Sequence, residues 1–494
     1  MVKNYPTTDG DGCVFMEIEQ EIYTGTLDYK GIDFNFIFSG NELRLVPPKD
    51  KVQDVYRDFL TRPLGNGAYT MNIPVMEESH LLGKCNESAK QIIFITRKGR
   101  NIGSENCVLL IEIQAYILCK YTRKAINRIR FSNSEIDCIH PISSSFSFTF
   151  GKSIEEFNET GVLTITTRDW DSTTTQKQEF DVDGRSVSAY FGVSRGISTK
   201  LGEPPLSLKS SLIFEFEPTD NFSFIYRLWH IAKNFLRFLC YRKNVYLPTA
   251  ELDAPCEDGK HENFAVLYVL GEEKETELDE LKKGKYIQQQ YIAGAEGVIL
   301  SDIASDMLYL RHLPDSHLPI DAARFIMITA AFEWEFHRNY PQGIPRSEET
   351  IKVETEVSEV LQNLVKNNTG KVKKKYKFLL KLVKSDSLQS EIEQIGRDYS
   401  EIVDIFGENL YALNHETLNY SEMGTRLADQ RNHFAHGDLD KDFIGLSLLD
   451  LIFLQFVIYA IQLKYYGVEE INIKRAINDL FARRLLIPEV GSSN

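Results

Sequence analysis

The chain has 494 residues, with 56 Lys and Arg against 71 Asp and Glu, which gives a formal charge of −15. Hydrophobic residues make up 43% and charged residues 26% of the chain, a balance that excludes wholesale disorder, a collagen-like repeat and a coiled-coil rod. The length allows about three domains. The acidic balance opposes general attraction to nucleic acid, because a phosphate backbone is bound through clustered Lys and Arg.

Cysteine usage and the first residues bear on the compartment. The seven cysteines are odd in number and include no C-x-x-C pair, so neither a disulfide framework nor a thiolate zinc site is indicated. The opening residues, MVKNYPTTDGDGCVF, lack the apolar run of a secretory signal. We therefore expect a cytoplasmic protein, and we predict no metal or other cofactor.

The N-terminal part is typical of β structure, with β-branched and aromatic segments separated by Gly, Asn, Asp and Pro. The strands that we predict first span 13–19, 32–38, 91–96, 107–119 and 162–167. In another, Phe146, Phe148 and Phe150 alternate with Ser and Thr, which places three rings on one face. A helix from Phe222 and a strand over 264–271 follow. We expect an antiparallel, sandwich-like or barrel-like domain over 1–300.

From about Pro319 the pattern is helical to the end. The first helix has Asp321 near its N-terminus, where an acid is favourable against the helix dipole. Further amphipathic or apolar stretches span 353–364, 392–406, 443–463 and 471–486. We expect a linker over 301–317 and a helical bundle over 318–494, so the predicted fold class is α+β.

One apolar stretch, FIGLSLLDLIFLQFVIYAIQL from Phe443 to Leu463, is long enough to cross a bilayer. Asp450, Gln455 and Gln462 interrupt it. An Asp near the centre of a membrane-spanning helix costs roughly 2.5 to 3.5 kcal/mol on insertion scales. We therefore favour a helix buried in the bundle over a membrane anchor, because a helix that is apolar all round is packed on every side.

Two apparent motifs fail on their context. Ser194 in GVSRG matches the G-x-S-x-G pattern of a hydrolase nucleophile elbow, but two prolines soon follow and prevent the required helix. We therefore predict a loop serine there. The GKS sequence at 151–153 matches the end of a phosphate-binding loop, but the first glycine of such a loop is missing.

The informative segment is DQRNHFAHGDLD, over 429–440, which gathers Arg431, Asn432, His433 and His436 just before the apolar stretch. On an α-helix at 100° per residue, Asn432 and His436 share a face, whereas Arg431 and His436 are about 140° apart. One helix does not aim both groups at a single point. A second copy brought in by two-fold association, or unwinding near the following glycine, would complete a pocket.

The sequence RNHFAHG resembles the R-[polar]-x-x-x-H signature of HEPN-domain proteins, with Arg431 as the arginine, Asn432 as the polar residue and His436 as the histidine. The surroundings are also similar, because an all-helical domain with the motif just before a long apolar helix is the HEPN arrangement. A β-rich part followed by such a domain is similar to the ApeA-like group. The HEPN resemblance covers about residues 318–486, and that of the N-terminal part is looser.

The resemblance implies a metal-independent endoribonuclease with a dimeric site and a role in bacterial defence against phage through abortive infection. A 2′-hydroxyl would attack its neighbouring phosphate and leave 2′,3′-cyclic phosphate and 5′-hydroxyl ends. His436 suits acid or base catalysis because imidazole titrates near neutrality. Arg431 offers a planar fork to two phosphate oxygens, and Asn432 would orient the phosphate or the imidazole. The implied partners are RNA, a second copy bound through the helical domain, and an unidentified phage-derived trigger.

The same residues have less specific interpretations. A polar helix end would pair Arg431 with Asp429 or Asp438 and leave His436 to cap carbonyl groups. His433 is more typical of a surface histidine than of a metal ligand, because the carboxylates nearby lack a recognised ligand spacing.

Two other features remain open. The stretch from Lys366 to Lys384 holds eight lysines and no acid, and it is either an RNA contact or the solvated face of an amphipathic helix. Glu333 is a candidate partner of Arg431 across the bundle, but most such carboxylates are surface charges and we do not select it. The rival functions are a non-catalytic HEPN module, which binds a nucleotide, an RNA or a protein, and a metal-dependent nuclease.

Overall fold

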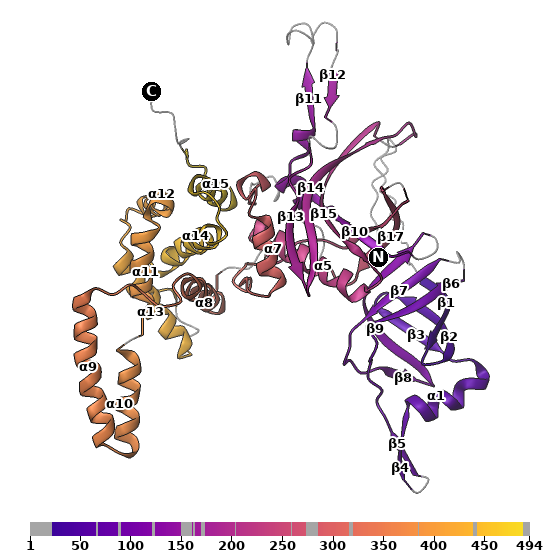
Figure 1. Cartoon of the computed structure of the whole chain (residues 1–494), viewed down its shortest axis with the longest axis horizontal. Coiled ribbons are helices and arrows are strands. Elements are labelled where there is room, and N and C mark those ends of the chain that lie inside the picture. The colour runs from indigo at the N-terminus through magenta and orange to yellow at the C-terminus, as the bar shows by residue number, and fades with distance from the viewer. Residues whose placement is uncertain are drawn as a thin grey trace. The chain divides into compact units, whose positions relative to one another are not determined.

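The computed structural model describes residues 22–487 apart from 66–67, 87–89, 121–123, 150–160, 162–163, 169–172, 203, 258, 273–284, 316–319, 384 and 438–441. The chain divides into two compact units. The first consists of Met1–Leu236, Asn244–Leu281 and Glu296–Ser305, and the second of Arg237–Lys243, Lys282–Ala295 and Asp306–Asn494. The first is rich in strands and the second is helical, so the α+β class is confirmed in this general form (Figure 1).

Six antiparallel strands of the first unit close into a barrel, in the order β9-β3-β2-β1-β6-β7 and back to β9. They are β1 (Ile22–Tyr29), β2 (Ile32–Ser39), β3 (Glu42–Val46), β6 (His80–Cys85), β7 (Gln91–Thr96) and β9 (Val108–Cys119). Strict alternation in β2 buries Phe34, Phe36 and Phe38 inside the barrel. The N-terminal domain is therefore built around a barrel, which removes exposed strand edges, and the sandwich-like alternative is wrong for this part.

The strand β9 is shared with a second, open part of the sheet, which continues as β17-β16-β10-β15-β14-β13. These strands are β10 (Ile126–Phe131), β13 (Gln178–Val182), β14 (Arg185–Ile197), β15 (Leu206–Thr219), β16 (Thr249–Pro255) and β17 (His261–Val269). Helix α5 (Phe222–Cys240) packs on one face, where Phe224 contacts Phe216 and Phe235 contacts Phe191. The apolar face of the open sheet is thus covered by a helix that the 3–4 residue spacing predicted.

The remaining elements of the β-rich part are short. They are α1 (Val52–Phe59), β4 (Thr61–Gly65), β5 (Ala68–Met71), β8 (Gly103–Glu105), α2 (Ser134–Ile139), β11 (Phe146–Thr149), β12 (Thr164–Thr167) and α7 (Glu296–Ala304). The segment 301–317, which we expected as a linker, begins inside α7. Ser194 lies within β14 and donates to the carbonyl of Lys209 at 3.1 Å, so the predicted loop serine is a strand residue. The predicted strand at 13–19, the GKS sequence and Phe150 lie outside the described residues.

The second unit is helical and includes helices at the stretches predicted after Pro319 and over 353–364, 443–463 and 471–486. The helices after Pro319 are α8 (Ala322–Asn339), α9 (Glu348–Asn367), α10 (Gly370–Leu382), α11 (Leu388–Asp398), α12 (Ser400–Ala412), α13 (Tyr420–Ala435), α14 (Ser447–Tyr465) and α15 (Glu470–Leu480). Asp321 is the N-cap of α8 and accepts from the backbone N–H of Arg324, as its position in the sequence suggested. The stretch 392–406, which we predicted as one helix, is divided at Tyr399 between α11 and α12.

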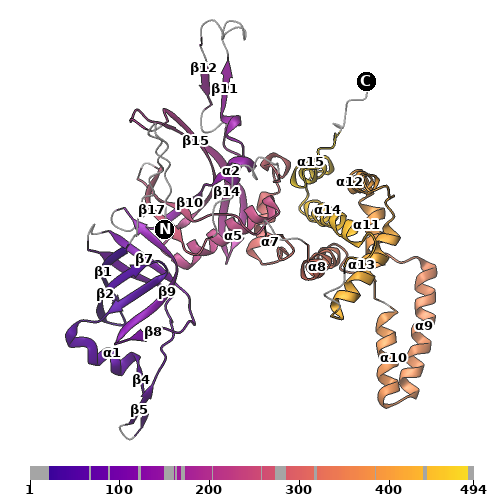
Figure 2. The same ribbon diagram turned by 180° about the vertical axis from the view of Figure 1, so that it is seen from behind.

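Helix α14 is the apolar stretch that has the length and composition of a membrane span. Within the helical unit most of its side chains are buried, including the polar Asp450 and Gln462. The carboxylate of Asp450 accepts from Nε of Arg426 at 2.7 Å, from a terminal nitrogen of the same guanidinium at 2.8 Å, and from the hydroxyl of Tyr411. This is the arrangement of a helix packed among other helices, seen from behind in Figure 2.

Gly25 of β1 is a position where the barrel leaves no room for a side chain. A Cβ atom there would lie 2.0 Å from the carbonyl oxygen of Lys84 and 2.6 Å from Cε1 of Phe36. We predict that Gly25→Ala destabilises the barrel by about 1 to 3 kcal/mol through overpacking. Thermal unfolding of the purified chain measures the loss, with Thr26→Ala at the exposed neighbouring position as the control. Equal midpoints for both variants would contradict this packing.

Candidate functional site

The sequence-predicted site lies at the C-terminal end of α13. Asn419 caps the start of the helix by accepting from the backbone N–H groups of Ser421 and Glu422. At the other end, His436 is the C-cap, and Gly437 has φ of +97°, a backbone conformation that favours glycine. The helix therefore ends at Ala435, within the motif and just before this glycine.

Two buried polar contacts fix this end of α13 against α14. Arg426 binds the buried Asp450 of α14 through two nitrogens, and this pairing raises the pKa of Arg426. One turn further on, the buried side chain of Gln430 accepts from the backbone N–H of Ile444 at 2.7 Å and from the hydroxyl of Ser447 at 3.1 Å. Ile444 and Ser447 are thus tied to α13, which fixes how this end of α13 meets the start of α14.

One of the partners that the sequence suggested for Arg431 was Asp429, but these two side chains do not pair. Its guanidinium donates to Oε1 of Glu333 in α8 at 2.5 Å. The Arg431 side chain is 35% exposed and that of Glu333 is 24% exposed, so the pair is accessible to solvent. Sequence reasoning set Glu333 aside as a surface charge, because nothing in the sequence fixes how α8 meets α13. The structure instead gives it a specific partner.

Asn432 and His436 are exposed, one turn apart on α13. Within one copy of the chain, no contact between described residues joins His436 to Arg431. This agrees with the separation of about 140° around the helix axis that the sequence predicted. His433 is half-buried, and within the described part of the chain no group of three or more His, Cys, Asp or Glu side chains is arranged to hold a metal ion. Asp438 and Asp440 lie outside the described residues.

A buried carboxyl group lies behind Arg431. Glu391 of α11 is 2% exposed, and its Oε1 is 3.8 Å from Nε2 of His337. Burial, together with repulsion from Glu333, raises the pKa of Glu391 to about 8, although Arg431 opposes the shift. Glu391 is therefore largely protonated at neutral pH, and Glu333 is the carboxylate that balances the charge of Arg431.

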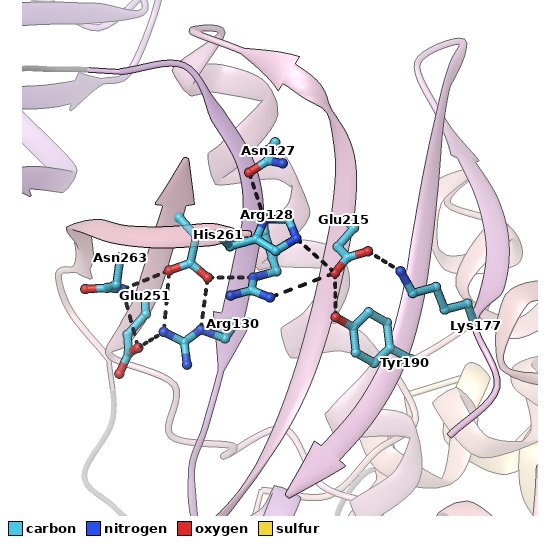
Figure 3. Close-up of polar contacts among 10 residues, drawn as sticks. Asn127, Arg128, Arg130, Lys177, Tyr190, Glu215, Glu251, His261 and Asn263 are labelled. Atoms are coloured by element: carbon cyan, nitrogen blue, oxygen red, sulfur yellow. Dashed lines mark hydrogen bonds and ion pairs between the residues drawn. The ribbon is translucent and has the colours of Figure 1, made fainter. Parts of the chain in front are cut away.

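A second polar cluster, which sequence reasoning missed, lies on the face of the open sheet opposite α5 (Figure 3). Asp253 of β16 is fully buried, and its carboxylate accepts from Nε of Arg128 at 2.6 Å, from Nε of Arg130 at 3.1 Å and from the amide of Asn263 at 3.1 Å. A carboxylate that is buried away from water stays charged only where hydrogen-bond donors of this kind bind it. The sequence signal that could have revealed this cluster is the alternation of apolar and charged residues in β10 and β16.

Glu215 of β15 is the other centre of this cluster. It accepts from the hydroxyl of Tyr190 at 2.5 Å and from the ammonium of Lys177, and it is 3.6 Å from Nε2 of His261. Burial alone would raise the pKa of Glu215, but the bonds from Lys177 and Tyr190 outweigh it and lower the pKa. Burial and the nearby Arg128 lower the pKa of His261, so its imidazole is neutral at pH 7.

A cavity of about 910 Å³, open to solvent, lies beside this cluster. It is bounded by β13, β14, β15, the start of β10 with the residues before it, and the start of β17. Its lining residues include Glu179, Glu215, Glu217, Asp220, Lys124, Arg185 and His261. All of these belong to the first compact unit.

Comparison with known protein families, with curated proteins and with solved structures found no match for this chain.

The raised pKa of Glu391 has a measurable consequence for stability. A carboxyl whose pKa is 4.5 when unfolded and about 8 when folded favours the folded state below pH 4.5, and this contribution is lost as pH rises through 8. We predict that Glu391→Gln, which keeps a neutral group there, raises the melting temperature relative to wild type at pH 9 more than at pH 5. Glu401→Gln, at an exposed position of α12, is the control. A pH-independent difference would contradict the buried, protonated carboxyl.

Proposed function

We propose that the protein is a metal-independent endoribonuclease of the HEPN type, which cleaves RNA to 2′,3′-cyclic phosphate and 5′-hydroxyl ends. The observation that carries this proposal is the end of α13, where an exposed imidazole, an exposed amide and a solvent-accessible guanidinium occur within one and a half turns. These are His436, Asn432 and Arg431. They fit the three needs of the reaction, namely proton transfer, orientation and stabilisation of charge.

The pairing of Arg431 with Glu333 affects how RNA would bind. A guanidinium can face a carboxylate and a phosphate at once, because its donors form a fork. Glu333 would then hold the guanidinium in place while other nitrogens meet the phosphate. His436 points about 140° away from Arg431 around the helix axis, so the proposed site takes the imidazole of one copy and the guanidinium of the other.

A surface suited to such association is the α9–α10 hairpin. These two helices pack on each other, as both ribbon views show, and Ser358 is their one buried side chain among the described residues. Large apolar side chains lie exposed along it, namely Ile351, Val353, Val357, Val360, Val372, Phe378, Leu379 and Leu382. Glutamates are concentrated at the start of α9 and lysines at the start of α10. Antiparallel two-fold pairing of two hairpins would cover the apolar side chains and oppose unlike charges.

A non-catalytic HEPN module is the alternative, and the Arg431–Glu333 ion pair is the observation that favours it. A guanidinium already neutralised by a carboxylate needs no substrate to balance its charge. The wider role that we propose is that of an ApeA-like effector of bacterial abortive infection, in which the β-rich unit senses a phage-derived trigger. That role comes from the resemblance alone.

The nuclease proposal predicts that the purified chain cleaves mixed cellular RNA in EDTA. His436→Ala and Arg431→Ala should each lower the cleavage rate by about 100-fold or more, because each removes a group used in the transition state. His433→Ala is the matched control, since it removes a histidine of the same motif that has no proposed role. Cyclic phosphate ends identify the mechanism.

Two outcomes would contradict this proposal. Loss of cleavage in EDTA would support a metal-dependent nuclease instead. RNA binding by wild type without cleavage, also in the presence of phage lysate as activator, would support the non-catalytic module.

The hairpin proposal predicts that Phe378→Asp weakens self-association by about tenfold or more, because a charge in an apolar interface costs well over 1.4 kcal/mol. Light scattering across a concentration series measures the mass in solution. Thr355→Ser, on the exposed surface of α9, is the control. A monomeric wild type at every concentration would exclude this interface.

A further inference from the structure

We propose that the cavity on the polar face of the open sheet binds an organic cation with two or more ammonium or guanidinium groups, such as an aliphatic polyamine. The proposal concerns the β-rich unit alone and does not depend on the nuclease assignment. It rests on the volume of the cavity, on the charge of its walls and on the arrangement of its carboxylates.

The cavity has the size of a small-molecule site. Its volume of about 910 Å³ lies within the range of roughly 300 to 1,000 Å³ that is typical of ligand pockets. Pro218 provides apolar surface among the polar lining residues, which suits an aliphatic chain between charged ends. A ligand of this type would contact both kinds of surface.

The walls of the cavity carry an excess of negative charge. The lining cations are Lys124 and Arg185, and the lining carboxylates are Glu179, Glu215, Glu217 and Asp220, so the sum is 2 − 4 = −2. The charged residues of the adjoining network are Lys177, Arg128 and Arg130 against Glu251, Asp253 and Glu262. Adding these gives 5 − 7 = −2, so these network residues leave the sum unchanged. The neutral His261 does not change it.

The positive groups are already engaged, which argues against an anionic ligand. Lys124 pairs with Glu262 at 2.8 Å, and Arg185 donates to the hydroxyl of Thr219 at 2.9 Å and lies over the ring of Phe224. An anion would have to take these cations from their partners and meet four carboxylates.

Two carboxylates are left for a ligand. Glu179 accepts from the hydroxyls of Ser186 and Ser188, which orient it without neutralising it. Glu217 has no ion-pair partner within the described part of the chain. Glu179 of β13 is paired with Ser188 of β14, and Ser188 is paired with Glu215 of β15. Glu217 lies two residues after Glu215 on β15. The three acids therefore share one face, spaced by strand separations of about 5 Å and a pleat repeat of about 7 Å.

This spacing suits separate ammonium groups on one chain better than a single metal ion. Metal-bound carboxylates converge on one point at about 2.0 to 2.6 Å. Among the residues that the structure describes, no group of three or more His, Cys, Asp or Glu is placed to do so.

Calorimetric titration of the full-length chain with spermidine tests the proposal, with wild type compared with Glu179→Gln, Glu217→Gln and the control Asp28→Asn. Asp28 is an exposed acid on β1 of the barrel, so its change alters the net charge equally. We expect saturable binding by wild type, binding about tenfold weaker for each cavity variant, and no change for the control. Raising the salt concentration should weaken wild-type binding.

Two further probes are titrated, one to distinguish a free polyamine from a basic peptide and one to test for an anionic ligand instead. An N-acetylated, C-amidated Lys-Lys dipeptide carries the same charge as part of a protein, and saturable binding of either probe that depends on Glu179 and Glu217 supports the proposal. Absence of saturable binding for both probes would overturn it. Equal affinity in all four chains, or tighter binding of AMP than of either cation, would overturn it as well.

Discussion

The buried carboxylate of Asp450 joins three helices of the helical unit. A charge that is fully removed from water must be bound by its own protein, and here Arg426 of α13 and Tyr411 of α12 bind it. Three helices are therefore fixed in rotation and in height relative to one another. The motif on α13 begins little more than one turn after Arg426, so its orientation follows from this contact.

The proposed site is built differently from that buried anchor. Arg431 and Glu333 are both partly exposed, so their attraction is screened and their geometry adjusts at low energetic cost. Behind them, Glu391 is deeply buried and largely protonated at neutral pH. The site thus consists of a firm interior, set by Asp450 and Gln430, and an exchangeable polar surface, which is the combination expected where a charged ligand must enter and leave.

Local patterns in the sequence predicted the local structure well. The strands at 32–38 and 91–96, the cap at Asp321 and the burial of the 443–463 stretch followed from alternation, capping chemistry and polarity. The barrel closure, the Arg431–Glu333 contact and the Asp253 network depend on which distant segments meet. One sequence contains no record of that pairing, and the serine of GVSRG shows how turn signals fail when a strand simply continues.

The strand β9 belongs both to the barrel and to the open part of the sheet, which limits how these two parts can move. This single strand bonds to β3 and β7 within the barrel and to β17 in the open sheet. A hinge between the two parts would have to bend this continuous strand or break its backbone hydrogen bonds. A deletion that removes either part would leave the other with an unpaired strand edge, which is a template for pairing with another chain.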